Sequence, residues 1–418
     1  MNSANYDNEK RKSRLWPLFL LLFTSVDTVL FGTNANKLFL YIPRFVALFI
    51  IISLPFIQSR KRGTLSFDKY SMSFFLLMIV SFCVSNFYNH EAFETFASRI
   101  LAIVVAFIVT CCYSEEDYFK AFDKFIYLVS ICAIITEIIA YVIPSFFIAF
   151  PSITNTVGSR FFVYFFGSME QANLGRTIIR ANGIFWEPGA FSIYLIIGIM
   201  NQLFGIGEIN NRHLFVYIMA LLLTFSTTGY VSLAFVILVF VFSKRTDLLS
   251  KRVKGVLIIG SVLIVIGSIL LDNNLIQNMV LGKLISGTSS ATTRYSSLFN
   301  GMKVAIDHPL FGVGSNFRPY MLEYVQSSIF NNGGTSITNT IVAQFACYGS
   351  IFGLLFFVGT IRFFKKWSTN MREWVALAIA ILLAYSGERF FSFMPFVFVF
   401  YGFCKGAFRK DVLKGNML

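Results

Sequence analysis

Long apolar runs separated by short polar segments make up most of the chain. Each run approaches the about 20 residues that a helix needs to cross the hydrocarbon core of a bilayer. The pattern predicts twelve spans: 15–33, 38–57, 71–88, 97–113, 121–143, 189–207, 214–226, 229–243, 255–271, 337–360, 373–386 and 390–404. The seventh and eighth spans share the break Ser226–Tyr230, so they also suit one long broken helix. The predicted fold is an all-α polytopic membrane domain over residues 1–418.

Composition supports a membrane protein. Of the 418 residues, 56% are hydrophobic and 13% charged, and the mean hydropathy is +0.69. Soluble domains carry about a quarter charged residues. The basic and then apolar N-terminus also resembles a signal peptide, but no small-residue cleavage site follows Leu30, so we expect an uncleaved first span.

The placement of Lys and Arg predicts the orientation. Alternate connecting segments carry 24 of the 35 basic residues and the opposite set carries nine. The positive-inside tendency therefore places both termini in the cytoplasm. Sorting across the membrane accounts for most of the +14 net charge, so a nucleic-acid partner is unnecessary. Two long segments, 145–188 and 272–336, fall outside, and there we expect the function to reside.

Cysteine and histidine offer little support for a disulfide framework or a metal site. All six cysteines lie within or at the ends of apolar runs, where they suit small packing residues. The three histidines are far apart, and neither C-x-x-C nor H-E-x-x-H occurs. We therefore predict neither a bound metal nor a cofactor.

The second outer segment predicts a helix along the membrane surface. A polar cap at Thr292 or Thr293 precedes apolar positions at helical spacing. Pro309 ends this helix, and the glycines of "GVGSN" that follow favour tight turns over a phosphate cradle. In the first outer segment, the "EPG" at residues 187–189 is typical of a helix start.

Four motifs, taken in order, resemble the superfamily of O-antigen polymerases (Wzy-type) and O-antigen ligases. They are "RANGIFWEPGAFSIYL" (180–195), "LLLTFSTTGYVSLAF" (221–235), "TTRYSSLFNGMKVAIDHPLFGVGSNF" (292–317) and "TNTIVAQFACYGSIFGLLFF" (338–357). The resemblance covers residues 180–357, whereas the first five spans match only in hydropathy. It implies a GT-C-like, metal-independent glycosyltransferase that acts at the outer face of the inner membrane on glycans linked to undecaprenyl diphosphate.

The resemblance leaves two enzymes open. Polymerases move a growing glycan onto the next lipid-linked repeat unit, and ligases move the finished glycan onto a lipid A core. The ligase pattern has a His-Asn pair where this chain has Thr338-Asn339, which favours the polymerase. The family also implies a chain-length regulator as a partner. O-antigen, capsule and exopolysaccharide pathways all remain open.

This chemistry needs cationic groups near the leaving diphosphate and a group that receives the proton of the acceptor hydroxyl. As catalytic candidates we nominate Arg180, Glu187, Arg294 and His308. As substrate-binding candidates we nominate Arg44, Arg99, Arg160, Arg176, Tyr295, Arg318, Glu388 and Arg389. Imidazole exchanges protons near neutral pH, while the helix start favours a charged Glu187, which suits an orienting role.

Simpler interpretations compete with these roles. The outer arginines suit contacts with lipid headgroups, and Glu187 suits a plain helix start. The intramembrane pair Arg44 and Arg99 suits partners such as Asp27 or Glu137. Glu388 and Arg389 suit a salt bridge that closes a turn.

A transporter, for instance a lipid-linked oligosaccharide flippase, is the alternative from another class. Transporters are typified by two similar halves with broken helices at matching positions. The sequence shows no such halves, and both long loops lie on one face.

Overall fold

The structure is a computed structural model that describes residues 15–25, 27–32, 45–51, 53, 69–154, 159–174, 179–205, 209–243, 289–327 and 336–404. In residues 289–296 and 325–327 it describes the backbone alone. The predicted span at 255–271 lies outside these residues.

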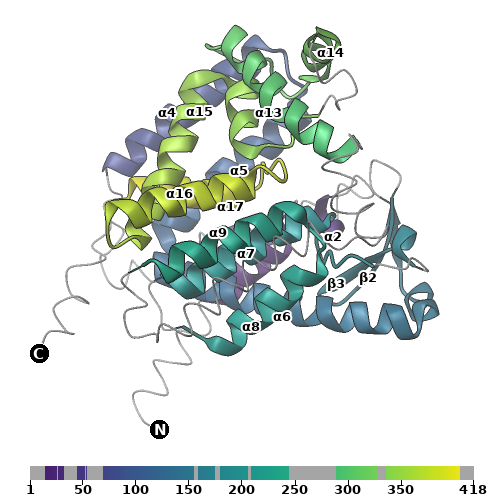
Figure 1. Ribbon diagram of the computed structural model, residues 1–418. Helices are drawn as coiled ribbons and strands as arrows, with labels where there is room; N and C mark the ends of the chain where they lie inside the picture. The colour runs from purple at the N-terminus through teal and green to yellow at the C-terminus, as the bar shows by residue number, and fades with distance from the viewer. Residues whose placement is uncertain are drawn as a thin grey trace, which may run out of the picture.

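The described chain is mostly helical (Figure 1). Residues 15–23 and 45–51 are helical. The further α-helices are α2 (Val29–Gly32), α4 (Lys69–Tyr88), α5 (Phe93–Cys112), α6 (Glu115–Val142), α7 (Pro188–Phe204), α8 (Asn211–Leu223), α9 (Thr227–Val241), α13 (Ser289–Asp307), α14 (Arg318–Ser327), α15 (Thr340–Trp367), α16 (Met371–Tyr385) and α17 (Phe393–Phe403). Among the described residues, α4, α5, α6 and α15 are long and apolar enough to cross a membrane, and α7, α8, α9 and α17 are shorter apolar helices.

Helical structure is therefore found at every predicted span that the structure describes, although the described part of 38–57 is short. Residues 214–243 form two helices. Ser226 begins the second, because its hydroxyl accepts the N–H of Gly229 at 3.3 Å. The first predicted span is interrupted, since its helix ends at Phe23 and α2 starts only at Val29.

Short polar residues set several helix starts. The Ser114 hydroxyl accepts the Asp117 N–H at 3.1 Å, and acidic residues fill the first turn of α6. At α16, Asn370 accepts the Glu373 N–H, and Glu373 accepts the Thr369 N–H in return. Such reciprocal caps satisfy N–H groups that the helix leaves unpaired.

The helices form two groups joined by a central pair (Figure 1). In the upper part of the view, α4, α5 and α13–α15 lie together, and α6–α9 lie in the lower part. Between them, α17 packs on α15 and α5, while α16 packs on α9 and α7. Stacked aromatic rings lie between the two groups: Phe398 of α17 stacks on Phe119 of α6 and on Phe363 of α15.

A polar cluster ties α6, α7 and α8 together. The carboxylate of Asp123 accepts hydrogen bonds from Gln202 and from the Tyr217 hydroxyl at 2.7 Å, and it lies 2.6 Å from His213 Nδ1. Tyr127 stacks on the His213 ring with 3.9 Å between the ring centres. Each of these side chains has a hydrogen-bond or ring-stacking partner on another helix, so we interpret the cluster as a structural link between α6, α7 and α8.

Helix α15 is broken at Gly349, whose φ of 83° and ψ of 176° are not helical. The turn between α13 and α14 fills the break. Val313 and Gly314 donate their N–H groups to the carbonyls of Ala346 and Cys347, each at 2.9 Å. Gly312 and Gly314 both have positive φ, as their predicted role in a tight turn requires.

The first of the two segments predicted to lie outside, 145–188, contains β-structure, which the all-α prediction missed. Strands β1 (Ser152–Thr154), β2 (Arg160–Tyr164) and β3 (Gly167–Glu170) form an antiparallel sheet in that order, with short 3₁₀ helices at Pro144–Ala149 and Gln171–Asn173. The alternation in "RFFVY" is too short to stand out beside the surrounding apolar runs. The sheet packs on the end of α6 through β3.

The second segment predicted to lie outside, 272–336, holds the expected helix as α13, which begins at Ser289, a few residues before the predicted cap. Ser297, Asn300 and Val304 are buried against α15. A second helix, α14, follows the turn and was not predicted.

Candidate functional site

The segment before α7 is an ordered buried turn. The Asn182 side chain donates to the Phe185 carbonyl at 2.8 Å and to the Ser168 hydroxyl at 2.9 Å. Gly183 has a φ of 57°, and a Cβ atom there would lie 2.9 Å from Val129. The turn therefore requires both the amide of Asn182 and a glycine after it.

Arg180 lies where α8 ends and α9 begins. Its Nε donates to the Thr224 carbonyl at 3.2 Å, and a terminal nitrogen donates to the Phe225 carbonyl at 3.4 Å. Helix C-termini leave carbonyls unpaired, and a cation there also meets the negative end of the dipole. Arg180 is half-buried, so it contributes to the structure of this turn and still presents charge at the surface.

Helix α7 begins at Pro188, as "EPG" predicted. Glu187 holds the capping position, but its side chain makes no capping hydrogen bond and is exposed. A carboxylate at this position is favoured by the helix dipole alone.

The first turns of α7, α9 and α15 meet at the loop between α16 and α17. A Cβ atom on Gly189 in α7 would lie 2.9 Å from Glu388 Oε1, and one on Gly387 would lie 3.4 Å from Thr228 in α9. The Thr340 hydroxyl at the start of α15 donates to the Glu388 carbonyl at 2.5 Å. We name this meeting of helix N-termini, with Arg180 and loop residues 386–392, the three-helix site.

Hydroxyl groups hold the three-helix site together. The Ser192 hydroxyl in α7 donates to the Ser226 hydroxyl, which caps α9, at 3.2 Å. Ser297 of α13 accepts the N–H groups of Thr338 and Asn339 at 2.6 and 3.2 Å. The start of α15 is thus fixed by α13, because Ser297 satisfies N–H groups that have no partner inside α15.

The three-helix site favours anions. Each helix N-terminus acts as roughly half a positive charge, and three of them meet here. Arg180 and Arg389 add full charges, while Glu388 and the exposed Glu187 at the start of α7 each subtract one. The guanidinium of Arg389 lies 4.8 Å above the Phe317 ring, so the loop between α13 and α14 also borders the site.

Arg99 does not pair with Asp27 or Glu137, so the expected intramembrane pairs were wrong for this residue. It forms a salt bridge with Glu91 at 3.2 Å and lies over the rings of Tyr348 and Phe391. Glu91 also accepts the N–H of Ser315. Arg99 thus anchors the α13–α14 turn, since the Glu91 that binds it also binds this turn.

Asp27 has polar partners of its own. It accepts the Tyr194 hydroxyl at 2.6 Å and the Ser25 hydroxyl at 3.2 Å. The segment that holds it pairs with the turn before α7 through a bridge between Thr28 and Phe185.

His308 makes its described contacts with α13 and α14. Its N–H donates to the Val304 carbonyl at 3.0 Å, and its ring meets the Tyr320 ring edge-on at 5.1 Å between centres. Nearby, a hydrogen bond to Asp307 raises the pKa of Tyr324 to about 12, so this hydroxyl remains a donor at neutral pH.

The other nominated residues lie apart or are not described. Arg160 is exposed on β2, donates to the Ser152 hydroxyl at 2.8 Å and lies over the Phe162 ring. Arg318 is exposed at the start of α14. Arg44 and Arg176 lie outside the described residues, and for Arg294 and Tyr295 only the backbone of α13 is described.

The structure therefore places Glu388 against the start of α7, Arg389 beside it in the same loop and over Phe317, and Arg180 at the turn before α9, with Glu187 exposed at the start of α7. Sequence reasoning missed Thr340, Ser297 and Glu91. A signal existed for the first, because "TNT" before a long apolar run is typical of a helix start. The partners of Ser297 and Glu91 are too distant in sequence to be anticipated.

The fold and the site define a helical membrane protein. No model of a known protein family matches the chain, and no curated protein or solved structure matches it either. Within the described part of the chain, no three His, Cys, Asp or Glu side chains gather where they could hold a metal ion.

Proposed function

We propose that this protein is a glycosyltransferase that polymerises a bacterial surface polysaccharide at the outer face of the inner membrane. The three-helix site carries the proposal. Meeting helix N-termini and two arginines suit a diphosphate, whose negative charge they stabilise. Three of the four motifs that resemble the polymerase and ligase superfamily supply the beginnings of α7, α9 and α15, whereas loop residues 386–392 lie outside these motifs.

In the proposed reaction, a hydroxyl oxygen of the acceptor repeat unit attacks the anomeric carbon of the growing glycan. The bond from this carbon to the diphosphate breaks, and undecaprenyl diphosphate leaves with the bonding electrons. Arg180 and Arg389 stabilise the charge that develops on the diphosphate. Glu388, the carboxylate within the site, orients the acceptor or receives its proton.

The test is a polymerisation assay with purified protein and lipid-linked repeat units in the presence of EDTA. Wild type should form a glycan ladder, and Arg180→Ala should lower the rate by about 10²–10³-fold, the loss typical of a removed charge-stabilising donor. Arg180→Lys should recover part of the activity, because it keeps the charge and loses the planar fork.

Arg212→Ala is the matched control, because it also removes an arginine beside α8, but one exposed at the start of that helix, opposite the end that Arg180 binds. Its ladder should equal that of wild type. Arg180→Ala also loses hydrogen bonds to α8, so each variant must first elute as a monodisperse species with an unchanged melting temperature. A folded Arg180→Ala variant with full activity would contradict the proposed role.

The break in α15 favours a second candidate, a flippase. Discontinuous helices whose N-termini face an anionic substrate are typical of transporters, and the half-helix from Thr340 to Tyr348 has this geometry. Flipping of a fluorescent lipid-linked glycan in proteoliposomes, without ladder formation, would establish this function. Transfer onto added lipid A core would instead identify a ligase.

A further inference from the structure

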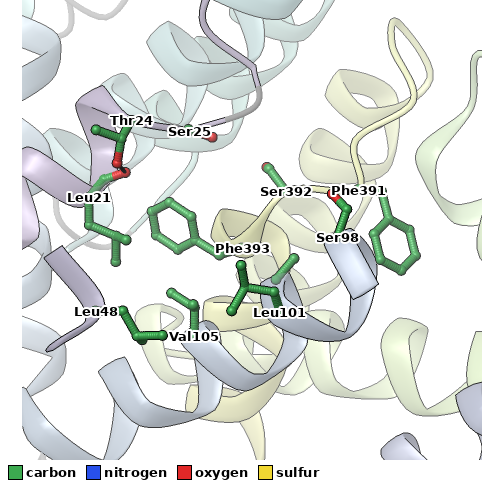
Figure 2. A pocket seen from close by; sticks show the side chains of 11 residues that line it. Leu21, Thr24, Ser25, Leu48, Ser98, Leu101, Val105, Phe391, Ser392 and Phe393 are labelled. Carbon is green, nitrogen blue, oxygen red and sulfur yellow. Dashed lines mark hydrogen bonds between the residues drawn. The ribbon is translucent and has the colours of Figure 1, made fainter. Parts of the chain in front are cut away.

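A large groove lies between the end of α9 and the start of α16, two helices that pack against each other (Figure 1). Its volume is about 830 Å³, which falls within the about 300–1,000 Å³ typical of sites that bind small organic molecules. By comparison, the cavity between α5 and the start of α17 (Figure 2) measures about 40 Å³, enough for a few water molecules. Of these two hollows, only the groove has room for a ligand of appreciable size.

The walls of the groove are mostly apolar. One face of α9, at the i, i+3, i+4 and i+7 spacing, lines one side with Phe235, Leu238, Val239 and Phe242. Opposite this face, α16 contributes Ala376, whose small side chain leaves the space open. Phe242 is 79% exposed, so the groove opens at the surface of the helical bundle. Because apolar surface is unfavourable in water, these walls suit a hydrocarbon chain.

The rim of the groove, at the start of α16, is polar. Asn370 and Glu373 lie there, but both are engaged in the helix cap. The Asn370 side chain accepts the Glu373 N–H at 2.9 Å, and the 4% exposed Glu373 accepts the Thr369 N–H at 2.7 Å. Arg372 is exposed, and within the described ranges it makes no hydrogen bond, ion pair or ring contact. The charge that the rim presents outward is therefore that of the Arg372 guanidinium.

The groove and the three-helix site lie at opposite ends of the same two helices. Helix α9 begins at the three-helix site and ends beside the groove, and its 15 residues span about 22 Å. Helix α16 begins at the groove and ends at loop residues 386–392. The connecting segments that adjoin the groove, 244–254 and 361–372, carry five and four basic residues and are among those predicted to be cytoplasmic.

We propose that this groove binds one anionic phospholipid of the leaflet that the sequence predicts to be cytoplasmic. The headgroup phosphate pairs with Arg372, and an acyl chain lies along the apolar face of α9. Charge complementarity favours this occupant over a zwitterionic lipid, because exposed arginine attracts the anionic headgroups of the cytoplasmic leaflet. The bound lipid joins α9 to α16. The site is separate from the proposed polymerase reaction, whose lipid-linked glycan is expected at the other end of these helices.

The experiment is photocrosslinking of the full-length chain in phosphatidylcholine nanodiscs. The probe is phosphatidylglycerol with a diazirine on one acyl chain, and phosphatidylcholine with the same diazirine chain is the comparison probe. The phosphatidylglycerol probe should label peptides that contain Leu238 and Ala376 more strongly than the comparison probe does, and unlabelled phosphatidylglycerol should displace it. Equal labelling by the two probes, or no labelling of these peptides, would overturn the proposal.

The headgroup contact is tested by Arg372→Ala. The phosphatidylglycerol concentration for half-maximal labelling should rise about two- to tenfold, while labelling by the phosphatidylcholine probe should not change. Lys365→Ala is the matched control, because it also removes an exposed cation near the start of α16, but one that lies over the Trp374 ring and outside the groove lining. An unchanged concentration for Arg372→Ala, or an equal rise for Lys365→Ala, would refute the role of Arg372.

The acyl-chain contact is tested by Ala376→Trp, which should fill the groove and abolish labelling at Leu238. Ile379→Trp, at a 42% exposed position of α16 outside the groove lining, should leave labelling unchanged. Each variant must elute as a monodisperse species before it is scored. Labelling at Leu238 that persists in a folded Ala376→Trp variant would contradict a chain bound in the groove.

The competing occupant is the apolar segment 255–271, which follows α9 in the sequence. With Phe242 replaced by the photoreactive amino acid p-benzoylphenylalanine, illumination should join this position to phosphatidylglycerol. A crosslink from position 242 to residues 255–271, without attached lipid, would assign the groove to that segment and overturn the lipid site. The ladder assay is unaffected by this outcome, so the polymerase and the lipid site stand or fall separately.

Discussion

The break in α15 offers the sharpest test of how the turn between α13 and α14 is held in place. At Gly349, φ is 83° and ψ is 176°, a region that residues with a Cβ atom almost never occupy. An added Cβ would lie 2.2 Å from the Leu310 carbonyl oxygen. Since that oxygen belongs to the backbone of the inserted turn, Gly349→Ala must move the turn out of the break.

The cost follows from the contacts that would be lost. The backbone conformation alone costs about 1–3 kcal/mol for a residue other than glycine. Displacing the turn breaks the hydrogen bonds that Ser350, Val313 and Gly314 donate across the break, each worth about 0.5–1.5 kcal/mol. Together the substitution should lower the free energy of unfolding by about 3–7 kcal/mol.

The assay is thermal unfolding in detergent, followed by size-exclusion chromatography of the heated samples. At about 2 °C per kcal/mol for a large domain, the melting temperature should fall by about 6–14 °C. Gly387→Ala is the control, because a Cβ there meets its nearest atoms at an ordinary 3.4 Å. If Gly349→Ala melts within about 2 °C of Gly387→Ala, the insertion does not stabilise the fold as argued.

Three further substitutions test single interactions, with Glu116→Gln, in an exposed pair, as a common control that should change stability by less than about 1 kcal/mol. Asp123→Asn removes the charge that accepts hydrogen bonds from α7 and α8, so the free energy of unfolding should fall by about 2–3 kcal/mol in thermal denaturation. Ser297→Ala removes the acceptor of the Thr338 and Asn339 N–H groups before α15 and should cost about 1–2 kcal/mol; an unchanged melting temperature would contradict this. Glu91→Gln weakens the hydrogen bond that the Ser315 N–H donates to residue 91. Limited proteolysis should therefore cut the α13–α14 turn faster than in wild type.

Most helix positions could be predicted because they depend on local sequence. An apolar run of sufficient length predicts a span wherever it occurs, and capping residues such as Ser226 act on N–H groups within three residues. Where the local signal is short or divided, prediction failed. The three-stranded sheet was missed for this reason, as was the interruption of the first span.

The candidate site could be predicted only in part. The motif at 180–195 pointed to Arg180 and Glu187, and it predicted the helix start at Pro188 correctly. It did not indicate that Arg180 binds the end of α8, because that contact joins residues 44 and 45 positions apart. The partner of Arg99 was likewise misjudged, since only the fold shows that Glu91 faces it.

The sequence by itself determined the helical membrane character of the chain, most of its helix positions and the uneven placement of its basic residues. These properties follow from hydropathy and charge, which are sums over neighbouring residues. Tertiary structure alone decided that the starts of α7, α9 and α15 meet at the loop between α16 and α17, and that Glu388 lies against Gly189. Such contacts join residues that are distant in the sequence. The hydropathy of a segment does not determine which apolar faces pack against one another.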